Sequence, residues 1–272
     1  MTQALSKLVY DRKGSGETVV LIHGIGHRRQ AWGPVFDQLS EKYDVIALDL
    51  AGFGESPAYA KGTPYTMDNA CADLVANFKE WGISSPHIVG NSLGGAIALE
   101  LGARGHASSV TALSPAGFFG TFDRAHPLGL LSVMQTAARF LPNPVLRLVA
   151  RTRFGRVLIG APLYSRPSLK SAEDTYLDAV AMGRSTSAFW RTVKSGLTYR
   201  FESEVQVPAT VAWGTKDKIL LYRQSTTAAS RLPNAVHVPL QGAGHVPMTD
   251  EPRAIVELID ETVARVAAAS AA

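Results

Sequence analysis

The segment GNSLG at residues 90–94 places one hydroxyl, that of Ser92, midway between two glycines. It follows an apolar run and precedes the helix-like segment AIALEL, so the chain is expected to turn there from a strand into a helix. Such a turn strains the serine and projects its Oγ, and side chains two residues away would collide. The N-terminus of the helix favours a developing anion. These features predict that Ser92 is a nucleophile.

A nucleophilic serine needs a general base, which makes the place of each histidine informative. His245 follows a late strand candidate, in the glycine-flanked segment QGAGHVP. His237 lies inside the strand pattern AVHVPL and is expected to be packed. His87 and His106 flank elements and are expected at the surface or as capping residues. His245 is therefore the predicted base.

The base needs an acid that orients it, and this acid is expected just after a strand. Asp217, in the segment WGTKDK, follows a strand candidate at residues 209–214. The strand after the nucleophile ends in SPAGF, which has no carboxylate, and Asp123 is the alternative acid. The sequence therefore predicts Asp217 as the partner of His245.

The segment HGIG at residues 23–26 ends the second predicted strand, where a loop can direct a backbone N–H at a reacting carbonyl oxygen. The N–H groups of Ile25 and Leu93 would together form a two-donor oxyanion hole, with Gly26 as the alternative to Ile25. Loss of one such donor typically raises the reaction barrier by ~3–4 kcal/mol. The imidazole of His23 is expected to brace this loop rather than to react.

The elements that must position these residues follow an alternating pattern. Strands are predicted near residues 8–10, 18–24, 43–50, 87–92 and 108–117, and helices near 30–43, 67–82 and after Ser92. The alternation predicts an α/β fold, with a mostly parallel sheet covered by helices on both faces. We expect a core of residues 1–117 and 207–272, interrupted by a helical insertion at 118–206.

The composition excludes several classes of protein. With 46% hydrophobic and 18% charged residues, the chain has ordinary globular composition, and no apolar run approaches the ~18 residues of a membrane span. A net charge of +4 is too small to indicate nucleic-acid binding, and no Cys/His cluster has zinc spacing. One cysteine and an N-terminus without an apolar signal region favour a cytoplasmic location.

Five segments occur in an order typical of one superfamily: HGIG (23–26), DLAGFGES (49–56), GNSLGG (90–95), WGTKDK (213–218) and GAGHVPMTDEP (242–252). In these segments, and in the order Ser92, Asp217, His245, the chain resembles the α/β-hydrolase superfamily over nearly its whole length. The resemblance implies a Ser-His-Asp hydrolase that needs neither a metal nor an organic cofactor. It also implies that the insertion is a cap domain over the site and that Asp49 and Ser56 are structural.

The predicted reaction is hydrolysis of carboxylic esters through an acyl-enzyme intermediate. Haloalkane dehalogenases and epoxide hydrolases of this fold use an aspartate where this chain has Ser92. GNSLGG also resembles the elbow of carbon–carbon bond hydrolases that cleave ring-fission diketone acids. Those enzymes usually have a longer glycine-rich loop and an aromatic residue after the histidine, where this chain has HRRQ and Val246. A cofactor-free perhydrolase or haloperoxidase and a non-enzymatic ligand receptor are the further alternatives.

Substrate contacts are expected from the loops around Ser92 and from the start of the insertion. The candidates are Gly24, Gly26, Asn91, Val246, Phe118 and Phe119. Other large apolar residues of the insertion either line an acyl or alcohol pocket or pack its own core: Phe122, Leu128, Met134, Phe140, Phe189 and Trp190. The predicted partner is a small apolar acyl substrate, and the sequence leaves its size and the oligomeric state open.

The insertion is the most basic part of the chain. Residues 118–205 contain twelve basic and six acidic side chains, whereas the rest of the chain is slightly acidic. In VLRLVARTRFGRVLI at 145–159, helical spacing brings several arginines near one face among aliphatic residues. Such a surface is either a solvated basic face or a face that docks on anionic lipid.

Overall fold

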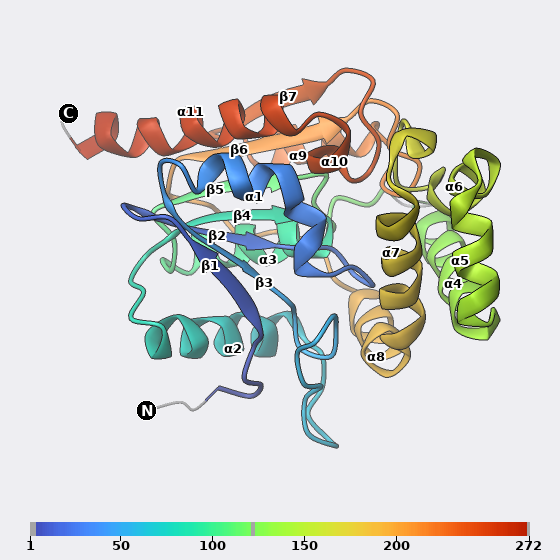
Figure 1. Ribbon diagram of the computed structural model, residues 1–272. Coiled ribbons are helices and arrows are strands. Elements are labelled where there is room, and N and C mark those ends of the chain that lie inside the picture. The colour runs from blue at the N-terminus through green and yellow to red at the C-terminus, as the bar shows by residue number, and fades with distance from the viewer. Residues whose placement is uncertain (1–3, 121–122, 271–272) are drawn as a thin grey trace.

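A mixed β-sheet forms the centre of the molecule (Figure 1). The computed structural model describes residues 4–120 and 123–270, and within them the sheet has seven strands in the order β1-β3-β2-β4-β5-β6-β7. The strands are β1 (Tyr10–Lys13), β2 (Thr18–Ile22), β3 (Asp44–Leu48), β4 (His87–Asn91), β5 (Ser109–Leu113), β6 (Ala209–Gly214) and β7 (Val236–Leu240). Only β1 runs antiparallel, to β3. The predicted α/β fold with a mostly parallel sheet is confirmed.

The first strand differs from its prediction. The apolar run at residues 8–10 predicted a strand there, whereas β1 covers Tyr10–Lys13. All four residues of β1 are exposed, because it is an edge strand at the margin of the sheet. An edge strand without a buried face has no hydrophobic alternation, which is the signal that the prediction requires.

Helices cover both faces of the sheet. They are α1 (Gly33–Leu39), α2 (Met67–Glu80), α3 (Leu93–Ala103), α9 (Gln224–Arg231), α10 (Pro247–Asp250) and α11 (Pro252–Ser270), with a short 3-10 helix η1 (Arg29–Trp32). Along β2, Val19 and Leu21 pack into the apolar cluster that includes α1 and α11. Val20 and Ile22 pack into the cluster that includes α2, α3 and α9. Alternate residues of one strand thus contribute to two cores on opposite faces.

The insertion between β5 and β6 is helical, with α4 (Ala125–Phe140), α5 (Asn143–Arg151), α6 (Arg153–Gly160), η2 (Pro167–Leu169), α7 (Ala172–Arg184) and α8 (Thr186–Gly196). Its helices lie beyond the end of the sheet at which the parallel strands terminate (Figure 1). Leu146, Ala150, Tyr176, Ala179 and Val180 form a small core of its own. None of the helices in the described ranges combines the length and apolarity needed to cross a bilayer.

Candidate active site

Ser92 occupies the sharp turn between β4 and α3. Its backbone has φ 56° and ψ −114°, a conformation that residues with a side chain rarely adopt. A Cβ at Gly90 would lie 2.0 Å from the carbonyl oxygen of Gly94, and a Cβ at Gly94 would lie 2.2 Å from that of Ile22. The two glycines are therefore required by close backbone packing, as the strand-to-helix turn predicts.

Asp217 and His245 form a buried pair. The Nδ1 atom of His245 lies 2.8 Å from Oδ2 of Asp217, and both side chains are almost completely inaccessible to solvent. The other oxygen of Asp217, Oδ1, accepts hydrogen bonds from the backbone N–H groups of Ile219 and Leu220, at 2.8 and 2.9 Å. These two bonds orient the carboxylate, which then holds the imidazole.

Asn91 connects the histidine loop to the strand that carries the serine. Its buried amide Nδ2 donates to the backbone carbonyl of His245 at 2.9 Å and to that of Leu113 at 3.1 Å. Asn91 is the last residue of β4, immediately before Ser92. A side chain proposed for substrate contact therefore holds backbone together, and it brings the loop of His245 next to Ser92.

The loop after β2 faces the same turn. The N–H of His27 donates to the carbonyl of Gly24 at 3.2 Å, which closes a turn whose central residues are Ile25 and Gly26. Gly26 has φ +72°, the left-handed conformation that glycine adopts most easily. A Cβ on Gly24 would lie 3.1 Å from Cβ of Ser92, so the loop passes directly beside the serine.

His23 braces this loop, as expected. Its Nε2 accepts the N–H of Leu50 at 3.0 Å, which leaves Nδ1 to donate to the carbonyl of Gly24 at 2.7 Å. Burial lowers the pKa of His23, so the ring is held neutral. Nearby, the buried carboxylate of Asp49 accepts the N–H groups of Arg29 and Glu55, at 2.6 and 3.0 Å.

Ser56 also has a structural environment. Its Oγ donates to the carbonyl of Asp49 at 2.6 Å and accepts the N–H of Val9 at 2.8 Å. These contacts agree with the expectation that Asp49 and Ser56 are structural.

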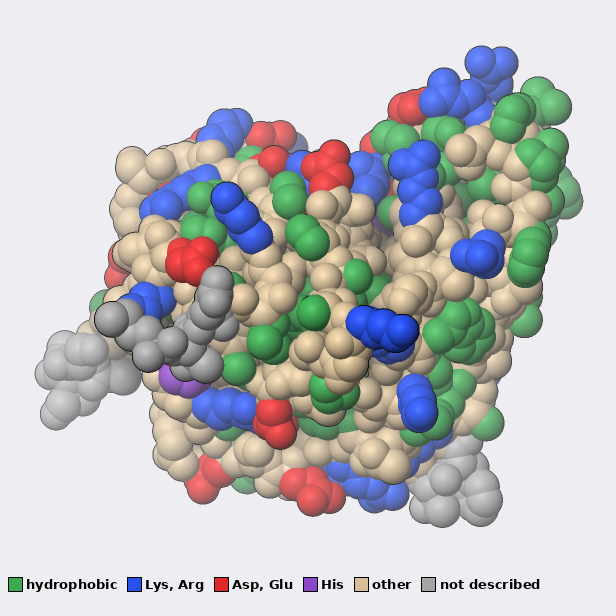
Figure 2. Space-filling view, turned by 90° about the horizontal axis from the view of Figure 1, so that it is seen from below, with side chains coloured by type: hydrophobic (Ala, Val, Ile, Leu, Met, Phe, Trp, Pro, Cys, Tyr) green, Lys and Arg blue, Asp and Glu red, His purple; other side chains and the backbone are tan. Residues whose placement is uncertain are grey.

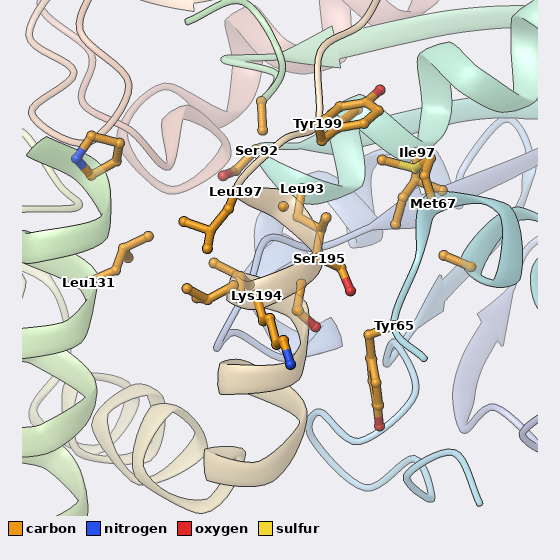
Figure 3. Close-up of a pocket in the computed structure, with 18 of the residues that line it drawn as sticks. Tyr65, Met67, Ser92, Leu93, Ile97, Leu131, Lys194, Ser195, Leu197 and Tyr199 are labelled. Carbon is orange, nitrogen blue, oxygen red and sulfur yellow. The ribbon is translucent and has the colours of Figure 1, made fainter. Parts of the chain in front are cut away.

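A cavity of about 430 Å³ opens at Ser92 between the core and the insertion. Figure 3 shows Ser92 beside Leu93 and Leu197, with Leu131 approaching from α4, whereas the amine of Lys194 on α8 points away from Ser92. Of the predicted site residues, the lining includes Ile25, Ser92, Leu93 and Phe119. The described lining does not include Gly24, Gly26, Asn91, Phe118, Asp217, His245 or Val246. Most of the remaining lining is aliphatic or aromatic.

Two of the proposed substrate contacts lie in the cores instead. Phe118 is fully buried and packs against the rings of Phe201 and Trp213. Val246 is buried in the cluster on the α1 and α11 side of the sheet. Gly26 faces the thioether of Met182, which a Cβ would approach to 2.3 Å.

Three other residues weighed from the sequence are placed as follows. His87, expected at the surface or as a cap, is buried within β4, with Nδ1 2.9 Å from Oγ of Ser109, so that expectation is wrong. A strand flanked by parallel neighbours on both sides buries all its residues. The alternative acid Asp123 pairs with Arg223. Phe122 lies outside the described residues.

A polar cluster that no sequence pattern predicts joins the loop after β2 to the insertion. His27 Nε2 lies 3.1 Å from the hydroxyl of Tyr164, which donates to Oδ2 of Asp178 at 2.9 Å. Arg28 and Lys170 pair with the same carboxylate, at 3.2 and 2.6 Å. Burial lowers the pKa of His27 to about 4. These residues are scattered along the chain, so only the fold brings them together.

Sequence reasoning also missed polar groups in the cavity wall. Arg124 and Lys194 line the cavity, and within the described chain neither forms an ion pair with a carboxylate. The buried Oγ1 of Thr192, also in the lining, has no hydrogen-bond partner among the described residues. For metals, the described part of the chain holds no cluster of three or more His, Cys, Asp or Glu side chains.

Comparisons with known proteins show the family to which the chain belongs. Lipase 1 of Psychrobacter immobilis is 27% identical over 266 residues, which cover 94% of this chain and 78% of that protein. A 2-hydroxy-6-oxo-6-(2'-aminophenyl)hexa-2,4-dienoic acid hydrolase of Metapseudomonas resinovorans is 28% identical over 250 residues, 89% of this chain and 82% of that protein. The solved structure of a thermophilic esterase from Thermogutta terrifontis superimposes with a TM-score of 0.75 at 18% identity, covering 97% of this chain and 98% of that one. Residues 17–252 match the family described as the alpha/beta hydrolase fold, and the chain therefore belongs to the α/β-hydrolase family.

Proposed function

We propose that this α/β hydrolase cleaves carboxylic esters through an acyl-enzyme intermediate, with Ser92, His245 and Asp217 as its catalytic triad. The observation that carries the proposal is the buried hydrogen bond between Asp217 and His245. The loop that carries His245 is held by Asn91, the residue that precedes Ser92. In this proposal residues 118–206 form a cap over a core of residues 1–117 and 207–272.

The first half of the reaction forms the acyl-enzyme. With its proton on Nδ1 and directed at Asp217, His245 has a free electron pair on Nε2 for the proton of Ser92. The serine Oγ attacks the acyl carbon as this proton leaves. The imidazolium, stabilised by the carboxylate, then returns the proton to the departing alkoxide, and the alcohol is released.

The negative charge of the tetrahedral intermediate needs donors near Ser92. The N–H of Leu93 is the first of helix α3, where backbone donors have no partner within the helix. The N–H of Ile25, in the turn beside Ser92, is the proposed second donor. In the second half of the reaction, His245 takes a proton from water as the water oxygen attacks the acyl carbon. The bond between that carbon and Ser92 Oγ then breaks, His245 returns the proton to Oγ, and the acid is released.

The cavity supports an apolar acyl group. Phe119, Leu128 and Leu131 from the insertion face Ile97 and Leu93 from the core across the same space. Water leaves such surfaces favourably when an aliphatic chain binds. We therefore expect kcat/KM to rise with acyl chain length until the chain no longer fits.

A panel of p-nitrophenyl esters of increasing acyl length tests this function directly. The wild-type chain is expected to hydrolyse them and to be labelled at Ser92 by a fluorophosphonate, whereas Ser92→Ala does neither. Ester turnover that is unchanged in Ser92→Ala, or a folded wild-type chain that neither turns over esters nor accepts the label, would refute the proposal.

A second candidate is hydrolysis of carbon–carbon bonds in ring-fission diketone acids. One observation favours it: the cavity lining includes two cations, Lys194 and Arg124, and although Arg124 donates to the carbonyls of Leu197 and Tyr199, its buried Nε has no partner within the described residues. A relative described above is named as a hydrolase of such a dienoic acid. If turnover of a vinylogous diketone acid exceeds that of every ester in the panel, this candidate replaces the first.

A further inference from the structure

The outer side of the insertion exposes large apolar side chains. They are Val133 and Phe140 on α4, Leu141 in the following turn, Val145 and Leu148 on α5, and Phe154, Val157 and Leu158 on α6. We call these eight residues the apolar patch. Phe140, Phe154 and Leu158 are 75%, 78% and 67% exposed. Concentrations of exposed apolar side chains mark interaction sites on soluble domains.

Figures 1 and 2 agree on where the patch lies. In Figure 1, α4, α5 and α6 are the helices farthest from the sheet, and α7 lies between them and the core. Figure 2 shows hydrophobic side chains along the same margin of the molecule, with lysine or arginine side chains beside them. The patch therefore occupies an outer end of the molecule, where a large flat partner can reach it.

The helices do not need the patch for their own packing. In α5, Leu146 and Ala150 already pack into the core of the insertion, against residues of α7. In α6, the three patch residues follow each other at spacings of three and one, and so share one exposed face. Both helices are therefore amphipathic with part of their apolar surface directed outward.

The charge around the patch is mainly positive, and the acid beside it, Glu173 in the first turn of α7, pairs with Arg147 at 3.2 Å. Residues 124–172 contain no aspartate or glutamate, whereas α4, α5 and α6 contain five arginines: Arg139, Arg147, Arg151, Arg153 and Arg156. Arg151 and Arg153 are exposed, and no carboxylate pairs with either of them in the described part of the chain. Apolar side chains bordered by arginine form a surface suited to the interface of an anionic membrane.

We infer that the apolar patch docks the insertion on the surface of a membrane that contains anionic lipid. A second copy of the chain fits less well, because a two-fold interface would bring Arg151 and Arg153 close to like charges, and the nearby acid Glu173 already pairs with Arg147. A bilayer offers the complement to both features, with acyl chains for the patch and anionic headgroups for Arg151 and Arg153.

Docking would also place the cavity near the lipid. The opposite side of α4 contributes Pro127, Leu128 and Leu131 to the cavity that opens at Ser92. The inference rests on the exposed surface and not on the proposed reaction. If both hold, the substrate would be an ester that partitions into membranes.

Vesicle flotation tests the inference, with Ser92→Ala as the parent so that no lipid is hydrolysed during the measurement. The parent is expected to float with vesicles of phosphatidylcholine and phosphatidylglycerol at low salt, and much less with phosphatidylcholine alone or at high salt. Arg151→Gln/Arg153→Gln should lower the partition coefficient for the anionic vesicles about 25-fold, since each arginine contributes about a fivefold factor near such a surface.

Phe154→Ser/Leu158→Ser tests the apolar half of the patch and should lower partitioning about tenfold or more. Its matched control is Val236→Ser, which removes a partly exposed apolar side chain from β7, and Arg253→Gln on α11 controls for loss of charge. Every position substituted in these four variants is exposed, so each variant should unfold near the melting temperature of the parent.

Absence of flotation with anionic vesicles at low salt would overturn the inference, as would equal flotation of the patch variants and their controls. Light scattering measures the oligomeric state of the parent and of the patch variants. A dimer that both patch variants convert to monomer, without vesicle binding, would identify a second copy as the occupant. Because every arm uses Ser92→Ala, failure of the docking is distinguishable from failure of the proposed ester hydrolysis.

Discussion

At the scale of single residues, Ser92 combines chemistry with backbone strain. Its positive φ is one of three among the non-glycine residues described, and such conformations typically cost about 1–3 kcal/mol each. Gly90 and Gly94 make the turn possible, since a Cβ at either position would overlap backbone atoms. The turn that imposes this strain places Ser92 in the lining of the cavity.

Substitutions at Ser92 are therefore expected to separate activity from stability. Both Ser92→Ala and Ser92→Gly should lower kcat by about 10⁴-fold or more, because each removes the proposed nucleophile. Ser92→Gly should also raise the free energy of unfolding by about 1 kcal/mol, since glycine adopts positive φ without strain. Ester kinetics and urea denaturation measure the two effects. A Ser92→Gly variant less stable than Ser92→Ala would contradict the assignment of strain.

At the scale of elements, one short segment of the insertion holds the two loops that we propose to be catalytic. The carbonyl of Leu163 accepts the N–H of Val246 at 3.1 Å, directly after His245. The next residue, Tyr164, contacts His27 in the loop after β2. Through Leu163 and Tyr164, the insertion thus contacts both the histidine loop and the proposed oxyanion loop. A substitution in this segment is therefore expected to alter the positions of both loops.

Asn91→Ala tests the tether between β4 and the histidine loop. The change leaves the buried carbonyls of Leu113 and His245 without this donor, which should destabilise the protein by about 1–3 kcal/mol. Displacement of the imidazole should lower kcat about 10–100-fold, with a smaller change in KM. Asn69→Ala, which removes an exposed amide bonded to Pro64, is the control. Unchanged kcat in a folded Asn91→Ala would show that the tether does not position His245.

The burial of His27 makes stability depend on pH. Burial lowers the pKa of His27 from 6.5 to about 4, so between these values the unfolded chain binds a proton that the folded chain does not. Stability is therefore highest above pH 6.5 and falls as the pH drops towards 4.

His27→Gln removes this titration and keeps an N–H donor near Tyr164. Between pH 7.5 and pH 5, the wild type should lose about 2 kcal/mol more of its unfolding free energy than the variant. Urea denaturation at the two pH values measures the difference, with the exposed His106→Gln as control. An identical pH dependence in wild type and His27→Gln would show that the buried ring titrates normally.

At the scale of the whole molecule, charge and apolar surface divide the chain into two unlike parts. The core buries its aliphatic residues in two clusters, one on each face of the sheet. The insertion has a small core, a large exposed apolar patch and most of the net positive charge. Such a division is consistent with the proposed catalysis in the core and the proposed docking by the insertion.

Cys71 reports on the integrity of the core as a whole. It is 1% exposed on α2, and burial raises the pKa of its thiol to about 12. In native buffer, Ellman's reagent should label it only at the rate at which the core opens. Labelling should become rapid through the urea transition. A Cys71→Ser/Ser230→Cys variant, with its thiol at an exposed position, is the control that labels at once. Rapid labelling of the wild type in native buffer would contradict the burial of α2.

Much of the candidate site could be predicted because its residues follow strands. In a parallel sheet the carboxyl ends of the strands share one edge, so Ser92 after β4 and Asp217 after β6 reach the same region. His245 follows β7 by the same rule. The 1–117 and 207–272 segments were recognisable from their alternation of strands and helices. The prediction for the edge strand β1 was two residues too early at its start, because an exposed strand lacks the hydrophobic alternation on which the prediction depends.

The sequence by itself determined the backbone of the site: two glycines where no Cβ fits, a serine forced into a strained turn, and an acid and a histidine at strand ends. Only the tertiary structure decided which side chains face the cavity. Phe118 and Phe119 are neighbours of the same type, yet one is buried against Trp213 and the other lines the cavity. Backbone requirements are local and can be read from spacing, whereas the direction of a side chain depends on what the rest of the fold packs against it.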